Sequence, residues 1–433
     1  MAPETRVLDR LVPSRIRGRW AQRRSGLFAR LTLMLAVIGP GVITANVDND
    51  AGGITTYTLA GARFGYSLLW TLLPITLALI VIQEMCARMG VVTGKGLADL
   101  IREQFGVRVT FYIMATLLVM NLANTIAEFA GVAAALEIFG VSKYVSVPAA
   151  ALFVWWLIVY GTYRRVENVF LVACLFYVAY VVSGLMAHPP WGEVLVRMVV
   201  PEFHWRADYV VMLVGLVGTT IAPWMQFYLQ SAVVEKGVRL ADYRYTWYDV
   251  IVGCFIAVIV AMFIMVACAA TLHQSHITVE TAQDAAIALA PLAGKYCSAL
   301  FAIGLFTASL FAASVLPLST AYYVCEGFGW ETGIDKKLHE APHFFGLYTA
   351  LIVLGGSFIL IPRFPLLGVM YLSQVLNGIL LPFVVILILL LVNRRDLMGR
   401  YVNTHMYNVV AWGTSVLMIG LTLVMVGALL LGY

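Results

Sequence analysis

The stretch Asn-Val-Asp-Asn-Asp-Ala-Gly-Gly, residues 46–53, interrupts an apolar run that is long enough to cross a lipid bilayer. It places two carboxylates, Asp48 and Asp50, and a Gly-Gly pair in the middle of that run. A carboxylate at membrane depth costs at least about 2.5 kcal/mol, and Gly costs about 1 kcal/mol relative to Ala inside a helix. Irregular backbone at that depth is tolerated only where protein buries it or where it lines a water-filled cavity. The stretch therefore predicts a helix that is broken at a polar site.

The composition is typical of a polytopic membrane protein. Of the 433 residues, 61% are hydrophobic and 12% are charged, and the mean hydropathy is +0.89. The six cysteines lie in or beside apolar runs, where we expect small buried hydrophobic residues and not a disulfide framework. Eleven apolar runs are long enough to be membrane spans: 32–60, 67–91, 109–138, 145–163, 168–187, 208–235, 248–272, 297–325, 344–361, 367–392 and 407–431.

The positive charges predict the orientation in the membrane. If the N-terminus is cytoplasmic, 22 of the 28 Lys and Arg residues lie in cytoplasmic segments and the other six lie outside, which is the bias that cytoplasmic loops carry. We therefore expect a multi-pass protein of the cell membrane with its C-terminus outside, and residues 1–31 as a basic cytoplasmic segment. The net charge of +5 follows from the same asymmetry, so we expect no nucleic-acid partner.

A second interruption lies in the sixth run, at Gly-Thr-Thr-Ile-Ala-Pro-Trp-Met-Gln, residues 218–226. Pro223 removes a backbone donor there and clashes with the preceding turn. A single kink is common, but runs one and six each begin a block of five, and paired interruptions are typical of two inverted repeats around a substrate site. We therefore expect an all-α membrane protein with unwound helices 1 and 6, five-helix repeats at 32–187 and 208–392, and an eleventh helix at 407–431.

The unwound segments predict a cation site. Such segments leave carbonyl oxygens free at the membrane midplane; Asp50 adds a charge beside them, and the carbonyls near Val47 and Thr219 add neutral oxygens. Asp50 could instead cap the unwound helix, and Asp48 is expected to hydrogen-bond the neighbouring backbone. The Asp50 charge would repel the carboxylate of an amino-acid substrate, and no Ser/His pair or His-Glu-x-x-His pattern inside the runs suggests an intramembrane enzyme.

Short motifs along nearly the whole chain carry a family resemblance. They are Gly-Pro-Gly at 39–41, Arg-Phe-Gly-Tyr-Ser-Leu-Leu-Trp at 63–70, Ala-Arg-Met-Gly-Val-Val-Thr-Gly-Lys at 87–95, Ala-Glu at 127–128, Gln-Val-Leu at 374–376, Pro382 and Met-Gly at 398–399. Together they resemble the natural resistance-associated macrophage protein (NRAMP) family of divalent-metal transporters. The resemblance implies the LeuT-type inverted-repeat fold and a transporter rather than an enzyme. We expect a functional monomer in the lipid bilayer.

The expected site departs from the family pattern at two ligands. The family's metal-binding Asp-Pro-Gly-Asn falls on residues 50–53, so Asp50 is kept and Gly53 replaces the Asn ligand. The family's Met-Pro-His falls on residues 222–224, so Ala222 replaces the thioether that favours soft metals. The loss of these two side chains is expected to enlarge the cavity enough for a partly hydrated ion.

This pattern is similar to the NRAMP-related magnesium transporter branch. Mg²⁺ prefers oxygen ligands and usually keeps several of its waters, so the resemblance implies uptake of Mg²⁺, with Mn²⁺ also accepted. The residues expected at the metal are Asp50, Gly53, Thr219, Ala222 and Gln374, and those expected to line the pocket or contact the ion's waters are Val47, Trp224 and Asn377.

Proton coupling is not expected. All seven histidines lie in loops or at the ends of apolar runs, and the positions of the family's titratable partners of Glu128 carry Thr125 and Trp224. Glu128 is interpreted as a vestibule charge or as the remnant of a relay, with Thr125 beside it. Alternating access would move the ion around a fixed midplane site. The alternative is a proton-coupled Mn²⁺ or Fe²⁺ symporter of the main NRAMP type.

Overall fold

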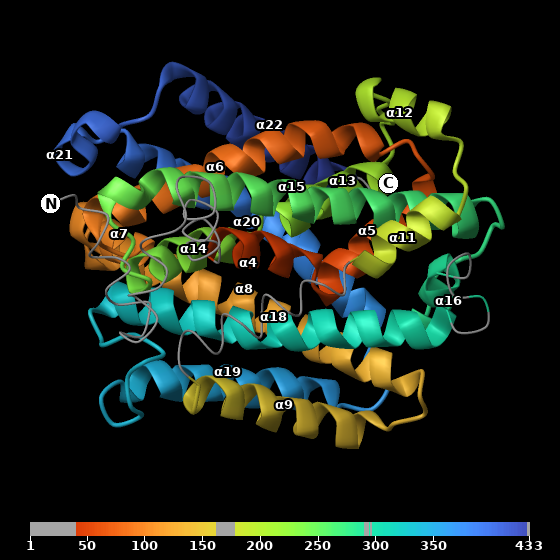
Figure 1. The fold of residues 1–433 in the computed structure, drawn as a ribbon, viewed down its shortest axis with the longest axis horizontal. Helices are drawn as coiled ribbons and strands as arrows, with labels where there is room; N and C mark the ends of the chain where they lie inside the picture. The colour runs from red at the N-terminus through yellow and green to blue at the C-terminus, as the bar shows by residue number, and fades with distance from the viewer. Residues whose placement is uncertain (1–39, 162–177, 290–293, 295–296, 431–433) are drawn as a thin grey trace, which may run out of the picture.

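The computed structural model of the protein shows a bundle of long, roughly parallel helices (Figure 1). The expected N-terminal segment, residues 1–31, lies outside the described residues, as do the start of the first run and part of the fifth. Within the part of the chain that is described, the secondary structure is entirely helical. The described residues are 40–161, 178–289, 294 and 297–430.

The helices follow the chain in two groups. The first group comprises α4 (Pro40–Asn46), η1 (Val47–Asn49), α5 (Ala51–Phe64), η2 (Leu69–Thr71), α6 (Leu72–Thr93), α7 (Leu97–Phe105), α8 (Val107–Glu137), α9 (Lys143–Val159), α11 (Val178–Met186) and α12 (Trp191–Val199). The second group comprises α13 (Ala207–Thr220), α14 (Pro223–Glu235), η4 (Leu240–Asp242), α15 (Tyr243–Cys268), η5 (Ala269–His273), α16 (Ala282–Ala286), η6 (Ile287–Leu289), α18 (Cys297–Phe328), α19 (Pro342–Ile359), α20 (Leu366–Val392), α21 (Arg395–Met398), η8 (Gly399–Tyr401) and α22 (His405–Leu430).

The expected membrane spans correspond to these helices. Eight described helical segments are long and apolar enough to cross a membrane, and they match the second, third and sixth to eleventh apolar runs. The fourth run is the 17-residue helix α9, and the fifth ends in α11. The first run is divided into α4 and α5. The protein is therefore an all-α, polytopic membrane protein.

Helix 1 is broken where the two carboxylates and the Gly-Gly pair predict it. After α4 the chain makes one 3₁₀ turn, η1, and then extends at Asp50, with φ −71° and ψ −173°. Asp50 is the N-cap of α5, because its Oδ1 accepts a 2.6 Å hydrogen bond from the backbone N–H of Gly53. An Asp at this position satisfies a backbone donor that the start of a helix leaves free. Asp50 therefore ends the break as well as carrying its charge.

Helix 6 is broken at Ile221 and Ala222, directly before a proline. Ala222 has extended backbone, with φ −67° and ψ 139°, as the residue before a proline prefers. Pro223 then occupies the first turn of α14, where its missing N–H costs nothing. The proline thus starts a new helix and does not merely kink an existing one, and the two halves α13 and α14 face the break in helix 1.

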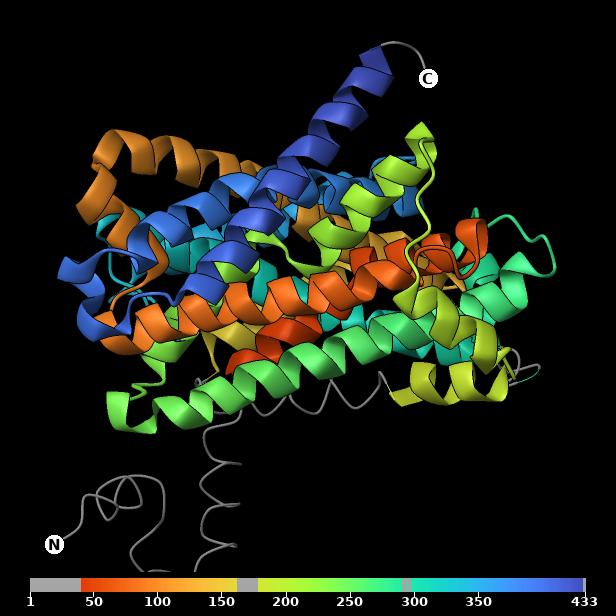
Figure 2. The ribbon, with the colours of Figure 1, turned by 90° about the horizontal axis from the view of Figure 1, so that it is seen from above.

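The broken helices lie inside the bundle (Figure 1). α15 packs against α4 and α5, α20 packs against α13, and α8 packs against both α18 and α20. The pair α9 and α19 covers the outer side of α8. α22 lies at the periphery against α20 and α6, and its C-terminal end projects from the bundle (Figure 2). The unwound segments are therefore enclosed by intact helices.

Glycines allow the broken helices to contact intact ones directly. A Cβ at Gly41 of α4 would lie 2.7 Å from the backbone nitrogen of Val250 in α15, so the two backbones touch. A Cβ at Gly218 of α13 would lie 2.2 Å from the backbone nitrogen of Gly378 in α20. Small residues give membrane helices this close approach. The Asp249 carboxylate strengthens the first contact by accepting backbone N–H groups of α4.

Candidate metal site

Two carboxylates meet at the break in helix 1. Asp50 and Glu128 are 4% and 0% exposed, and their carboxyl groups lie within electrostatic range of each other. Oε2 of Glu128, which comes from α8, also accepts a 3.2 Å hydrogen bond from the backbone N–H of Ala51, while its Oε1 is unpartnered among the described residues. Like charges this close repel unless a cation or a proton lies with them. The break therefore provides an electrostatic reason to bind a cation.

Thr219 faces the same turn from the other broken helix. A Cβ placed on Gly53 would lie 3.2 Å from Oγ1 of Thr219. This hydroxyl oxygen is buried and has no hydrogen-bond partner in the described part of the chain. A buried hydroxyl without a partner is unusual, and an ion or its water would satisfy it. The expected proximity of Thr219 to the break in helix 1 is present in the structure.

Gly53 does not leave the open space that its replacement of an Asn side chain suggests. A Cβ at this position would lie 2.1 Å from the backbone carbonyl oxygen of Asp48, which is far inside contact distance. The carbonyl of η1 occupies the volume that a side chain would need. The expected enlargement of the cavity at Gly53 is therefore wrong, and Gly53 is required here for the close approach of η1 to α5.

Gln374 lies against the first turn of α5. A Cβ at Gly52 would lie 1.8 Å from its Nε2, so only a glycine admits the amide at this position. Oε1 of Gln374 accepts a 2.9 Å hydrogen bond from Nδ2 of Asn377, one turn further along α20. The structure therefore places Gln374 directly at the break and Asn377 behind it.

The other expected residues lie around the break in different roles. The methyl group of Ala222 cannot bind a metal, and its carbonyl accepts a 3.2 Å hydrogen bond from the N–H of Met225. Val47 and Trp224 are buried, with 0% and 3% exposed, as wall residues would be. Thr125 donates to the carbonyl of Asn121 within its own helix at 2.7 Å, so that hydrogen bond does not join it to Glu128.

Asp48 does not make the backbone hydrogen bonds expected of it. Its side chain is 2% exposed, and both of its carboxylate oxygens lack a hydrogen-bond partner among the described residues. The N–H groups of Ala51 and Gly53 at the start of α5 are bound by Glu128 and Asp50 instead. The prediction for Asp48 is therefore wrong.

The sequence reasoning missed an amide network that extends from the site. Asn124 of α8 and Asn377 of α20 exchange two hydrogen bonds, of 3.0 and 3.2 Å. Asn121 accepts from Asn124 at 3.1 Å and donates to Oγ1 of Thr320 in α18 at 2.8 Å. The spacing of Asn121, Asn124 and Glu128 by three and four residues, which puts all three on one helix face, was the signal available in the sequence.

A second missed contact joins the two broken helices. The hydroxyl of Tyr57 in α5 lies 2.8 Å from Oγ1 of Thr220 in α13. Thr220 donates its own hydroxyl hydrogen to the carbonyl of Leu216 at 2.8 Å, so Tyr57 is the donor between them. Both residues are buried. The halves that carry Asp50 and Thr219 are thus held together one turn from the site.

The donor set is sparse for a permanent metal centre. In the described ranges, no group of three or more His, Cys, Asp and Glu side chains could hold a metal ion. The groups available at the break are the carboxylates of Asp50 and Glu128 and neutral oxygens such as the Thr219 hydroxyl. Such a set suits an ion that keeps part of its hydration shell and must leave again.

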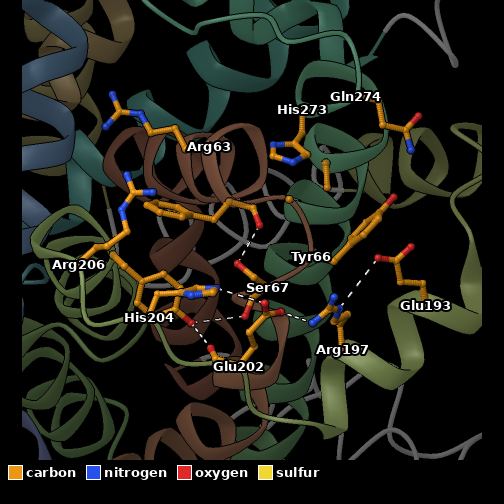
Figure 3. Close-up of a pocket in the computed structure, with 14 residues that line it drawn as sticks. Arg63, Tyr66, Ser67, Glu193, Arg197, Glu202, His204, Arg206, His273 and Gln274 are labelled. Atoms are coloured by element: carbon orange, nitrogen blue, oxygen red, sulfur yellow. Dashed lines mark hydrogen bonds and ion pairs between the residues drawn. The ribbon is translucent and has the colours of Figure 1, made fainter.

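A separate pocket of about 450 Å³ lies beyond the far end of α5 (Figure 3). It is bounded by the corner after α5, by α12 and by the segment that precedes α13. The carbonyl of Glu202 accepts hydrogen bonds from Trp70 Nε1 at 3.0 Å and from the Tyr209 hydroxyl at 2.5 Å. Its carboxylate pairs with Arg197 and with His204. The residues that line this pocket do not include Asp50, so the pocket is separate from the metal site.

Comparison with known proteins identifies the family. A family model described as natural resistance-associated macrophage protein-like (Nramp) matches residues 41–428. The chain belongs to this family. It is a transporter family, so the expectation that this NRAMP protein is not an enzyme is confirmed.

Two curated relatives of this NRAMP protein carry the name divalent metal cation transporter MntH. The relative from Deinococcus radiodurans is 29% identical over 408 residues, which cover 90% of this chain and 88% of the relative. The relative from Erwinia tasmaniensis is 30% identical over 384 residues, which cover 86% and 90%. The similarity therefore extends over most of each chain.

Solved structures of low identity show the fold. The manganese transporter of Eremococcus coleocola, crystallised with an aromatic bis-isothiourea compound, superposes with a TM-score of 0.77 at 22% identity, covering 94% of this chain and 88% of the other. Mhp1, a nucleobase-cation-symport-1 family transporter, superposes with a TM-score of 0.56 at 17% identity, covering 90% and 93%. The expected LeuT-type fold is confirmed.

Proposed function

We propose that this NRAMP protein is a divalent-cation transporter that prefers partly hydrated Mg²⁺, also accepts Mn²⁺ and works without proton coupling, as a member of the NRAMP-related magnesium transporter branch. The names of its relatives support divalent-metal transport in general. One observation carries the Mg²⁺ preference. The break in helix 1 presents the Asp50 carboxylate and the unpartnered Thr219 hydroxyl, both of them oxygen ligands, with the Nε2 group of the Gln374 amide beside them as a donor to the ion's waters.

The chemistry of Mg²⁺ fits these donors. Mg²⁺ is held by one or two carboxylates and retains several waters. Asp50 would bind the ion directly, and Thr219, Gln374 and Asn377 would accept hydrogen bonds from its waters or donate to them. The sulfur of Met370, one turn before Gln374, accepts a hydrogen bond from Thr55 at 3.7 Å and is thereby engaged. Soft metals would lose the sulfur ligand that favours them.

The surroundings of Glu128 support transport without proton coupling. Its carboxylate accepts the backbone N–H of Ala51, and the residues at the positions of the family's titratable partners, Thr125 and Trp224, do not titrate. The seven histidines lie in loops or near helix ends in the described structure. The driving force would be the ion gradient and the membrane potential, the latter about 4.6 kcal/mol per 100 mV for a divalent ion.

The mechanism would be alternating access between two repeats. We assign residues 32–187 to the first repeat, 208–392 to the second and 407–431 to an eleventh helix outside them. α22 supports the last assignment because it packs at the periphery. The charge bias supports an N-terminus in the cytoplasm and a C-terminus outside the cell, and the proposed unit is a monomer in the cell membrane.

The contact between Asp50 and Glu128 favours a second candidate function. Two buried carboxyl groups within electrostatic range of each other can exchange a proton for a cation, which is what a proton-coupled Mn²⁺ or Fe²⁺ symporter requires. The two candidates differ in what enters with the metal.

Transport into liposomes tests both. The full-length protein would be reconstituted with a trapped Mg²⁺ indicator and, in parallel, a trapped pH indicator. The proposal expects Mg²⁺ influx without acidification, its loss in Asp50→Ala, and normal influx in Asp208→Ala, a matched control at the exposed start of α13. Mn²⁺ influx with acidification, and no Mg²⁺ influx, would instead establish the symporter.

A further inference from the structure

Asp48 is a buried carboxylate that the proposed transport site does not use. It is 2% exposed, and neither of its carboxylate oxygens has a hydrogen-bond partner among the described residues. A buried charged group without a partner is strongly unfavourable, and native proteins rarely keep one without a reason. Asp48 therefore needs a partner that the protein side chains around it do not supply.

The surroundings of Asp48 are the junction of η1, α6 and α15. Asp48 lies within electrostatic range of Cys254 in α15, and the Cys254 thiol donates to Oε1 of Gln83 in α6 at 3.6 Å. Nδ2 of Asn49 donates to the carbonyl of Ala257 at 3.3 Å, one turn further along α15. Three elements thus bring polar groups to one face of α15.

These polar groups are mostly acceptors. Four unpartnered atoms among the described residues are oxygens: both carboxylate oxygens of Asp48, Oδ1 of Asn49 and, one turn earlier, Oδ1 of Asn46. The unpartnered donor at this junction, within the same described part of the chain, is Nε2 of Gln83. Asn46 and Asn49 are 0% exposed, so bulk water does not satisfy them. The Nδ2 groups of both asparagines are used, by Val42 and Ala257 respectively. An excess of buried oxygen acceptors around one carboxylate is the environment that a hard cation prefers.

We propose that Asp48 binds a second hard cation at the junction of η1, α6 and α15, with Oδ1 of Asn49 as a neutral oxygen ligand. The site would take the transported divalent ion or Na⁺, which share this oxygen chemistry. It lies on the α4 side of the break, whereas Asp50 caps the α5 side. The inference rests on the proposed function in that Asp50 holds the first ion.

Two ions this close would influence each other. Asp48 and Asp50 are within electrostatic range, so cations bound at both would repel through a medium of low dielectric constant. Occupation of the Asp48 site would therefore weaken binding at Asp50. That coupling would help the ion at Asp50 to leave its site.

The stoichiometry of Mn²⁺ binding tests the second site. Free and bound Mn²⁺ would be measured by electron paramagnetic resonance with the full-length protein in detergent. Two ions are expected for the wild type, one for Asp48→Asn and one for Asp50→Asn. Excess Na⁺ that displaces the Asp48-dependent ion would identify a sodium site, and no displacement would identify a divalent one; either supports the proposal.

Control variants keep the test decisive. Asn49→Ala removes one neutral ligand and should weaken the Asp48-dependent ion about tenfold, which is informative even if Asp48→Asn does not fold. Asp208→Asn, at the exposed start of α13, should bind two ions. The second site would be overturned if, in Na⁺-free buffer, the wild type and Asp48→Asn bound the same number of Mn²⁺ ions and Asn49→Ala bound them with wild-type affinity. Binding that survives Asp50→Asn in full would instead refute the proposed transport site, so the two failures are distinguishable.

Discussion

Oδ1 of Asp50 accepts a 2.6 Å hydrogen bond from the backbone N–H of Gly53. The residue proposed to bind the metal is therefore also the N-cap of α5, and its two functions use different oxygens or different lone pairs of one carboxylate. A substitution at Asp50 removes the charge and the cap together. Neighbouring positions are consequently better probes of selectivity than Asp50 itself.

Gly53→Asn should not restore the metal selectivity of the main NRAMP pattern. Any Cβ there would lie 2.1 Å from the carbonyl oxygen of Asp48, so the η1 turn must shift. We expect at least a tenfold loss of Mg²⁺ uptake in liposomes, with Gly53→Ala showing the same loss because it has the same Cβ. Wild-type uptake rates in Gly53→Asn would contradict this account of the break.

Ala222→Met should increase the ability of soft metals to compete. The new thioether would come from the break in helix 6, and sulfur favours metals such as Cd²⁺ over Mg²⁺. We expect Cd²⁺ to inhibit Mg²⁺ uptake at roughly tenfold lower concentration than in the wild type, which corresponds to about 1.4 kcal/mol. Ala222→Leu, which adds similar bulk without sulfur, is the matched control. Equal Cd²⁺ sensitivity in both variants would show that the side chain of residue 222 does not reach the ion.

The Asn124–Asn377 pair should stabilise the contact between α8 and α20. Asn124→Ala leaves Oδ1 of the buried Asn377 amide without its donor, which typically costs about 1–3 kcal/mol. The double variant Asn124→Ala/Asn377→Ala should cost less than the sum of the single variants by about 0.5–3 kcal/mol. Denaturant unfolding in detergent micelles would measure all three. Strict additivity would mean that the two amides do not interact in the membrane-embedded protein.

Asp249→Asn should loosen α4 from α15. The Asp249 carboxylate accepts the backbone N–H groups of Gly41 at 2.7 Å and Val42 at 3.2 Å. Loss of a negative charge beside helix N–H groups costs about 0.3–2 kcal/mol. The melting temperature should fall, and amide hydrogen exchange should rise in α4 more than in α5. A uniform rise over the whole chain would indicate global destabilisation and not a local contact.

Hydropathy and helix-breaking residues predicted the membrane helices and both breaks. Pro223 and the Gly-Gly pair at residues 52 and 53 act within their own turns, so their effect is readable from the chain itself. The charge of Asp50 at membrane depth also indicated a polar site before any contact was known.

The packing around the breaks could not be predicted in the same way. Asn124 and Asn377 are 253 residues apart, and nothing in either apolar run indicates which helix the other will face. The clash at Gly53 depends on where the η1 carbonyl lies, which is a property of the folded turn. The environment of Asp48 is likewise formed by three elements, η1, α6 and α15, that meet only in the folded protein. Local sequence therefore suggested backbone hydrogen bonds for Asp48 that the fold does not provide.

The Tyr57–Thr220 hydrogen bond restricts how the bundle can open. It joins α5 to α13 beside both breaks. A motion that separated α5 from α13 would have to break this hydrogen bond in an apolar interior. A motion that moved the two helices together would leave it intact. In any gate that keeps this bond intact, α5 and α13 therefore move as one unit.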